Sequence, residues 1–293
     1  ADAVSRHQHR AAREASENQS VLTLKTKDNI MKKILAIAFA VFMAICTTVG
    51  IVVYSMSEET YKRLGGGDYE EESEEMDEYT SRVDNFIGIN AADSVEVIYS
   101  SGASQVRCCG SIQALRDYSV RVEAGRLNIT CIKYARAPKL TVYATSPKLE
   151  SVFLGGACRF RSEGVWVAPQ GFIAACHGAS KLEMPNLVCY SNANITAIDA
   201  SKVEINPDCQ YIDIHADDAS NVDVQILSES KRVSIYTSGV SKVKLAAHDK
   251  NDSIYVDARE TSKVILSGET GGLTTDKDMT ANINTDKLKV TRK

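Results

Sequence analysis

The sequence predicts an all-β protein whose C-terminal two-thirds winds as a parallel β-helix, or solenoid, of coils about 21 residues long. Two observations carry this prediction. A short motif recurs at an even period, and the apolar residues on both sides of it alternate with polar ones. Alternation with period two is typical of strands that bury one face. Its repetition at a fixed interval is typical of stacked repeats.

The motif is a small residue, usually Ser, followed by a charged or polar residue and an alternating apolar pair. Its small residues are Cys158, Ser180, Ser201, Ser220, Ser241 and Ser262, the first belonging to a degenerate copy. Their spacings are 22, 21, 19, 21 and 21 residues. Six copies at so even a period rarely arise by chance, so this part of the chain is expected to be a repeat domain.

The flanks of each motif copy predict two short strands that meet at a tight corner near the Ser. The apolar residues around one copy are Ile212, Ile214 and Ala216 before Ser220, and Val222 and Val224 after it. A helical repeat would need apolar residues three and four positions apart, whereas these positions are alternating and rich in β-branched residues. One coil cannot bury its own inward face, so successive coils are expected to stack about 4.8 Å apart.

The repeats define the predicted domain organisation. Residues 155–266 hold the regular coils, and residues 82–154 contain strand-like segments that form either an N-terminal cap or the first irregular coils. Residues 267–293 are expected to form a C-terminal cap, because the open ends of a solenoid would otherwise pair edge to edge. Together, residues 82–293 form one β-solenoid domain.

The segments before this domain indicate export. Residues 31–56 open with two lysines and continue into an uncharged apolar run at 34–54, which is typical of a signal peptide or a retained membrane-anchor helix. Residues 1–30 lack strong hydrophobic periodicity and are expected to be an upstream or disordered segment. Residues 57–81 are strongly acidic and include three consecutive glycines, so we expect a disordered linker.

The charge distribution excludes one class of function. Most of the excess negative charge lies in the acidic linker, and the part of the chain that follows it is close to neutral. A nucleic-acid-binding domain is expected to carry a clustered basic surface. We therefore expect no nucleic-acid partner.

One outward row of side chains is the candidate binding site. The residues directly after the small residue of each motif are Arg159, Lys181, Lys202, Asn221, Lys242 and Lys263. In a stacked solenoid they form an exposed ladder, which could bind an anionic or glycan polymer through repeated weak contacts. The alternative is a solvated face on which basic and acidic rows offset each other, with each exposed ion pair contributing little.

Catalytic and metal sites are not indicated. The carboxylates of Glu183, Glu204 and Asp223 suggest a glycosidase or lyase, but neighbouring coils give such carboxylate separations automatically. The histidines have no ligand-like spacing and no Cys-x-x-Cys pair occurs, so we expect neither a metal nor a cofactor. Cys189 and Cys209 lie nearly one coil apart and are expected to stack, either as a disulfide bridge or as a ladder of core thiols.

Short sequence motifs also carry a family resemblance. Phe86-Ile87-Gly88-Ile89-Asn90 is followed by Ser94-Val95-Glu96-Val97 and then by repeats of the type Gly178-Ala179-Ser180-Lys181-Leu182. From about residue 86 to the C-terminus the chain resembles the auto-transporter adhesin head GIN domain family of Bacteroidota envelope proteins. The resemblance implies an exported, solenoid-like β domain with an adhesive role and no catalytic residues. Several copies depart from the family pattern, with Asp199, Asp218 or Glu260 in place of Gly.

These observations predict a non-enzymatic, exported binding scaffold or adhesin at the cell envelope, in the periplasm, anchored to a membrane or at the cell surface. Its expected partner is a surface glycan or protein, with membrane contact through residues 34–54 if the apolar run is retained. Two alternatives stay open: an envelope structural or sensory module that binds a partner protein, and a carbohydrate-active enzyme, a glycosidase or lyase, on a β-helix.

Overall fold

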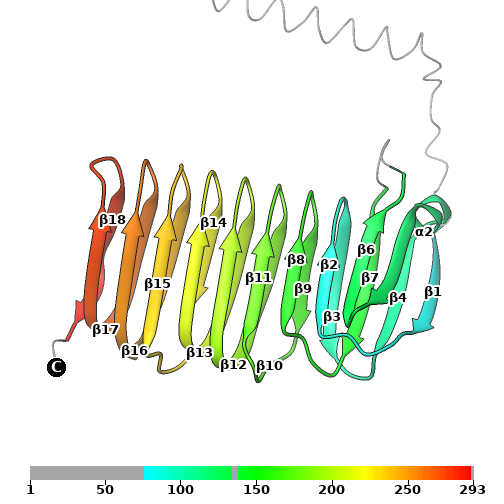
Figure 1. Ribbon diagram of the computed structural model, residues 1–293, viewed down its shortest axis with the longest axis horizontal. Helices are drawn as coiled ribbons and strands as arrows, with labels where there is room; N and C mark the ends of the chain where they lie inside the picture. The colour runs from blue at the N-terminus through cyan, green and yellow to red at the C-terminus, as the bar shows by residue number, and fades with distance from the viewer. Residues whose placement is uncertain (1–75, 134–137, 292–293) are drawn as a thin grey trace, which may run out of the picture. The chain divides into compact units, whose positions relative to one another are not determined.

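The computed structural model describes residues 76–133 and 138–291 (Figure 1). These residues form an all-β parallel solenoid, as the sequence predicts, and the solenoid has about seven turns. The predicted upstream segment at 1–30, the signal or anchor at 31–56 and most of the acidic linker lie outside the described residues. In the described part of the chain, no helical segment has the length and apolar character needed to cross a bilayer.

The regular coils pair in parallel, and register shifts interrupt the pairing only at short irregularities of β12, β16 and β17. Their strands are β11 (Phe172–Cys176), β12 (Lys181–Ala197), β13 (Lys202–Ala216), β14 (Asn221–Gln225), β15 (Arg232–Thr237), β16 (Lys242–Ala258), β17 (Lys263–Lys277) and β18 (Asn282–Val290). Ile214 pairs with Ile235, which pairs with Val256 in the next coil. All three side chains are fully buried. The apolar residues of successive coils therefore form a common interior column, and the predicted period and register are confirmed.

The corner of each coil depends on a residue in the left-handed region, two positions before the buried Ser. These residues are Gly178, Asp199, Asp218, Gly239 and Glu260, with φ between 58° and 71°. Only Gly adopts such a conformation without steric cost, although Asp and Asn tolerate it better than most residues. The Ser that follows fits inside the corner, where each one is at most 1% exposed.

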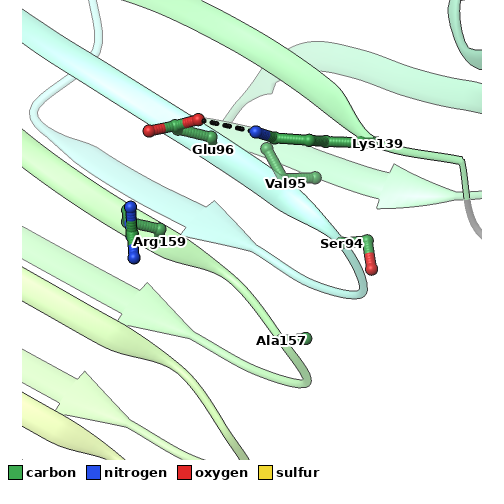
Figure 2. A pocket seen from close by; sticks show the side chains of 6 residues that line it. All are labelled: Ser94, Val95, Glu96, Lys139, Ala157 and Arg159. Carbon is green, nitrogen blue, oxygen red and sulfur yellow. Dashed lines mark ion pairs between the residues drawn. The ribbon is translucent and has the colours of Figure 1, made fainter.

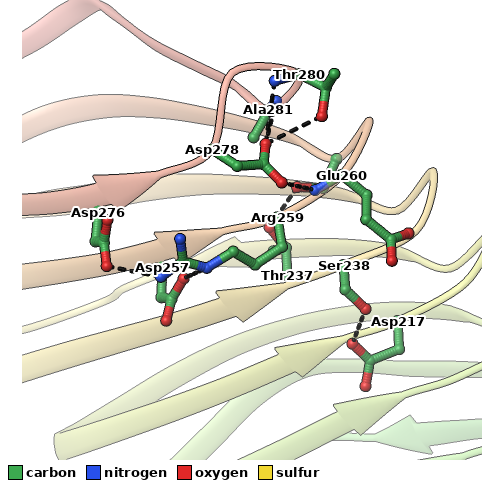
Figure 3. A network of polar contacts seen from close by, with 11 residues as sticks. Asp217, Thr237, Ser238, Asp257, Arg259, Glu260, Asp276, Asp278, Thr280 and Ala281 are labelled. Atoms are coloured by element: carbon green, nitrogen blue, oxygen red, sulfur yellow. Dashed lines mark hydrogen bonds and ion pairs between the residues drawn. The ribbon is translucent and has the colours of Figure 1, made fainter.

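Two of the acidic residues that replace Gly at these corners, Asp199 and Glu260, have a structural role. A carboxylate oxygen of Asp199 accepts a hydrogen bond from the backbone N–H of Gly178 at 2.9 Å, and Glu260 does the same for Gly239 at 2.9 Å. Figure 3 shows a related contact at the next corner, where Asp278, three residues before Ala281, accepts from the backbone N–H of Glu260 at 2.6 Å. In these three cases the side chain of one coil satisfies a corner N–H of the coil before it, which explains the acidic residues at 199 and 260.

The N-terminal part winds in a different spatial order from its sequence. It contains β1 (Met76–Arg82), β2 (Gly88–Ala91), β3 (Val95–Ser101), β4 (Gln105–Ser111), α2 (Ile112–Asp117), β5 (Tyr118–Glu123), β6 (Arg126–Cys131), β7 (Leu140–Ser146), β8 (Ser151–Leu154), β9 (Arg159–Glu163) and β10 (Trp166–Ala168). β2 lies between β6 and β8, and β3 lies between β7 and β9. The coil made by β2 and β3 is therefore enclosed by coils that come later in the chain.

Antiparallel strands close this end of the stack. β4 pairs antiparallel with β7, β1 pairs antiparallel with β4, and β5 pairs antiparallel with β6. In Figure 1 β1 and β4 lie at the opposite end from β18. At the other end the winding continues through β17 and β18, where Ala281 occupies the small-residue position of the motif. The partly buried Ile283 and Leu288 of β18 pack against the end of the core.

Cysteines form part of the interior. Cys189 and Cys209 are register partners on β12 and β13, and each is 2% exposed. Both thiols are free. The hydrogen bond between them lowers the pKa of Cys189 and raises the pKa of Cys209. The expected stacking is therefore present as a ladder of core thiols.

Candidate functional site

The predicted ladder lies in one outward row on the strands that follow the corners. In-register pairing joins Arg159, Lys181, Lys202, Asn221, Lys242 and Lys263. All six side chains are partly or fully exposed. The same row includes Glu96 on β3, beside Arg159, and Asn282 on β18, beside Lys263. The structure thus brings all six residues together as a continuous line on the surface.

Ion pairs divide this ladder into unlike halves. In the middle coils, Lys181 pairs with Glu183, and Lys202 pairs with Glu204 at 2.5 Å. The hydrogen bond from Lys202 lowers the pKa of the Glu204 carboxyl and raises the pKa of Lys202 itself. Each Lys is two residues from its partner on the same strand, so both side chains point outward and meet. The positive charge of the ladder is offset there.

The C-terminal half of the ladder keeps its charge. The position two residues further on holds Lys244 and Ile265 instead of an acidic residue. Lys244 pairs across coils with Asp223 at 3.1 Å. Lys242 and Lys263 are direct cross-strand neighbours, and among the described residues neither has a carboxylate within ion-pair distance. Like charges placed directly opposite each other destabilise a sheet, so this pair is a positive surface that the fold itself does not require.

The other end of the ladder borders a shallow hollow of about 400 Å³. Figure 2 shows its lining residues and the ion pair between Lys139 and Glu96. The distance from Lys139 Nζ to the Glu96 carboxylate is 3.2 Å. Arg159 is the register partner of Glu96, and it has no ion-pair partner among the residues the structure describes. The Arg159 guanidinium is therefore available at this end.

The same contacts weaken the enzymatic alternative. A glycosidase general acid needs a carboxyl whose pKa is raised, so that it stays protonated until it donates. The pKa of Glu204 is instead lowered, and Glu183 and Asp223 are held by lysines. Within residues 76–133 and 138–291, no group of three or more His, Cys, Asp or Glu side chains is arranged to hold a metal ion.

A second exposed feature was missed by the sequence analysis. It is a hollow of about 640 Å³ on the strands before the corners, and its lining includes His215, Tyr236 and Tyr255. His215 and Tyr236 each stand five residues before the Ser of their coil, so they are equivalent positions. The sequence analysis compared the histidines only with one another. Alignment of every outward position to the repeat would have placed the histidine beside the tyrosine.

The described geometry is that of a repeat protein with two polar outer faces and a closed hydrophobic interior, in which the carboxylates beside the ladder are held in ion pairs. The family and structural comparisons agree with this class. This chain belongs to the family described as "Putative auto-transporter adhesin, head GIN domain", whose model matches residues 85–292. The resemblance drawn from the sequence motifs is therefore confirmed. No curated protein matches the sequence significantly.

Solved structures share the fold. A "putative adhesin" from Bacteroides fragilis has a TM-score of 0.60 at 16% identity, covering 72% of this chain and 96% of its own. A "putative adhesin" from Parabacteroides merdae has a TM-score of 0.50 at 9% identity, covering 71% and 95%. A "putative lipid binding protein" from Parabacteroides distasonis has a TM-score of 0.50 at 14% identity, covering 71% and 93%. At these identities the likeness establishes the fold alone.

Proposed function

We propose that this protein is a non-enzymatic binding scaffold of the cell envelope, an adhesin that holds a surface polymer or protein against the outer rows of its solenoid. Membership of an adhesin-like family supports a position at the envelope or surface. The apolar run at 34–54 supports export, with either cleavage or retention as an anchor. Repeated outward positions support binding by many weak contacts that add along a polymer.

The observation that carries the proposal is the uncompensated pair Lys242 and Lys263. Two ammonium groups on adjacent coils repel each other, and an acidic group from a partner would relieve that repulsion. The middle of the ladder lacks this property because Glu183 and Glu204 already occupy its lysines. We therefore assign the anionic contacts of the partner to the C-terminal half of the ladder and to Arg159.

A matched pair of double variants tests this assignment. Lys242→Gln with Lys263→Gln removes two positive charges from the free half, and Lys181→Gln with Lys202→Gln removes two from the neutralised half. Binding of the full chain to immobilised polygalacturonate is measured, with dextran as a neutral control. The first variant is expected to weaken binding about tenfold, which corresponds to the loss of two exposed contacts of roughly 0.7 kcal/mol each.

The Lys181/Lys202 variant is expected to bind almost as the wild type does, and added salt should weaken the wild-type interaction. Equal losses in both double variants would refute the assignment to the free half of the ladder. Crosslinking in intact cells separates adhesion from the envelope-module alternative. Targets outside the cell support the adhesin, and one recurring envelope protein supports the module.

A further inference from the structure

The hollow lined by His215, Tyr236 and Tyr255, on the strands before the corners, has the features of a ligand-binding site. Its floor is one outward row in four successive coils, formed by Asn194, Asp213, Ser234 and Tyr255. Ser234 is small and only 4% exposed, so the surface is depressed between Asp213 and Tyr255. The volume of about 640 Å³ lies within the range of about 300–1,000 Å³ that is typical of small-molecule sites.

Aromatic rings form one wall of this hollow and hold each other in place. The rings of His215 and Tyr236 are stacked, with centroids 4.8 Å apart and planes 12° apart. The Tyr255 ring lies 5.8 Å from that of Tyr236 and is tilted by 54°. Mutual contact restricts the rotamers of these side chains before any ligand binds, so little conformational entropy remains to be lost on binding.

The polar groups of the hollow are free to bind a ligand. The side chains of Asn194 and Asp213 make no hydrogen bond or ion pair with any other described residue. On the other side, the Arg232 guanidinium lies over the ring of Tyr211, 5.9 Å from its centroid, and has no ion-pair partner among the described residues. A carboxylate, an amide and a guanidinium therefore line one depression together with tyrosine rings.

The chemistry of this lining selects the class of ligand. An anion would meet Asp213, and a cation would meet Arg232. A lipid chain would remove both charges from water without giving them a partner, which is costly. A neutral polyhydroxylated ring satisfies all of them, because its hydroxyls both donate to Asp213 and accept from Arg232. Its C–H groups also cover the apolar surface of tyrosine.

We propose that this hollow binds a neutral oligosaccharide. The proposal rests on the proposed binding function but uses a surface separate from the lysine ladder. A second hollow of about 420 Å³ shares Asn194 and continues along the stack toward Arg126 on β6 and Ile173 on β11. An oligosaccharide that lies along the solenoid axis would occupy both hollows, so the affinity is expected to increase with chain length from a disaccharide to a tetrasaccharide.

The test uses the full chain and arrays of neutral oligosaccharides of two to six hexose or N-acetylhexosamine units. Asp213→Ala and Tyr255→Ala are each expected to weaken binding at least tenfold. The matched control is Tyr190→Ala, because Tyr190 is 64% exposed and is not among the residues that line the hollow. The control and the Lys242/Lys263 variant should bind as the wild type does, and circular dichroism should be unchanged in all of them.

The outcomes distinguish this inference from the proposed function. If no neutral oligosaccharide binds while polygalacturonate does, the saccharide site is refuted and the scaffold function stands. If oligosaccharides bind equally well to Asp213→Ala and Tyr255→Ala, the site is refuted as well. If neither class of polymer binds, and intact cells show no crosslinked partner, both proposals fail.

Discussion

The N-terminal coils and the regular coils of this solenoid fill their interiors in different ways. The largest fully buried side chains are Phe86, Tyr99, Phe160 and Trp166 of the N-terminal part and Phe172 of β11, the first strand of the regular coils. From β12 onward the interior column consists mainly of Val, Ile, Leu and Ala. Identical coil spacing demands side chains of similar size, so a regular stack selects aliphatic residues. The N-terminal end departs from the repeat, so its interior varies in shape and is filled by larger, aromatic side chains.

The aromatic cluster of the N-terminal part gives the first and largest prediction. The Tyr99 ring lies 4.1 Å from that of Trp166 and 6.1 Å from that of Phe160, and the Tyr99 hydroxyl donates to the backbone oxygen of Ser146 at 3.1 Å. Phe160→Ala is expected to cost about 3–5 kcal/mol in free energy of unfolding because it leaves a cavity. Ile235→Val in the regular stack should cost about 0.5–1.5 kcal/mol.

The single tryptophan makes the measurement local. In urea, Trp166 fluorescence reports on the aromatic cluster, and far-ultraviolet circular dichroism reports on the whole stack. Phe160→Ala should shift the fluorescence transition to lower urea than the circular dichroism transition, because distant repeats are stabilised mainly by their own neighbours. Coincident shifts in both signals would show that the two regions unfold as one unit, and the comparison between them would fail.

Two glycines, one in each region, allow the cost of backbone strain to be measured separately from the cost of close packing between coils. Both Gly268 in β17 and Gly164 after β9 have positive φ, of 94° and 88°. A Cβ at Gly268 would lie 2.0 Å from the carbonyl oxygen of Ala247 in the coil below, whereas a Cβ at Gly164 would meet nothing within 4 Å. Gly164→Ala should therefore cost about 1 kcal/mol through strain alone. Gly268→Ala should cost at least about 3 kcal/mol, since the stacked backbone must also move.

Thermal unfolding of the two variants checks this difference. A similar decrease in Tm for both variants would mean that the backbone at Ala247 moves away at little cost. That result would contradict the close stacking that parallel pairing imposes. A larger decrease for Gly268→Ala would show that coil spacing limits which residues a regular coil accepts.

The regular coils were predictable from the sequence because one physical constraint recurs in each of them. The period, the register of Ile214, Ile235 and Val256, and the ladder from Arg159 to Lys263 all follow from that repetition. The enclosed position of β2 and β3 was not predictable, since it depends on long-range pairing that no local pattern encodes. The division of the ladder was visible in principle, because Ile265 stands where Glu183 and Glu204 stand in other coils. The hollow beside Tyr236 depends on three-dimensional shape and on the small size of Ser234.

A charge reversal in the ladder tests whether its C-terminal half is maintained for binding. Lys263→Glu places a carboxylate opposite Lys242, which replaces a repulsive cross-strand pair with an attractive one. The free energy of unfolding should increase by about 0.5 kcal/mol, and binding to polygalacturonate should decrease. Lys181→Glu is the matched control, because it removes the partner of Glu183 and should lower the free energy of unfolding, while polygalacturonate binding should fall less than in Lys263→Glu. A loss of stability in Lys263→Glu would contradict the assignment of Lys242 and Lys263 as an unpaired pair.

The smallest expected effect concerns pH and the neutralised half of the ladder. Because the hydrogen bond from Lys202 lowers the pKa of Glu204 below its ordinary value of 4.5, ionised Glu204 stabilises the folded state. That contribution is fully present above pH 4.5 and disappears as the pH falls through the lowered pKa. Glu204→Gln should therefore be less stable than the wild type by a few tenths of a kcal/mol at pH 7, the amount typical of an exposed pair. The two proteins should converge in urea denaturation below that pKa, and a difference that persisted there would mean that Glu204 acts through packing instead of charge.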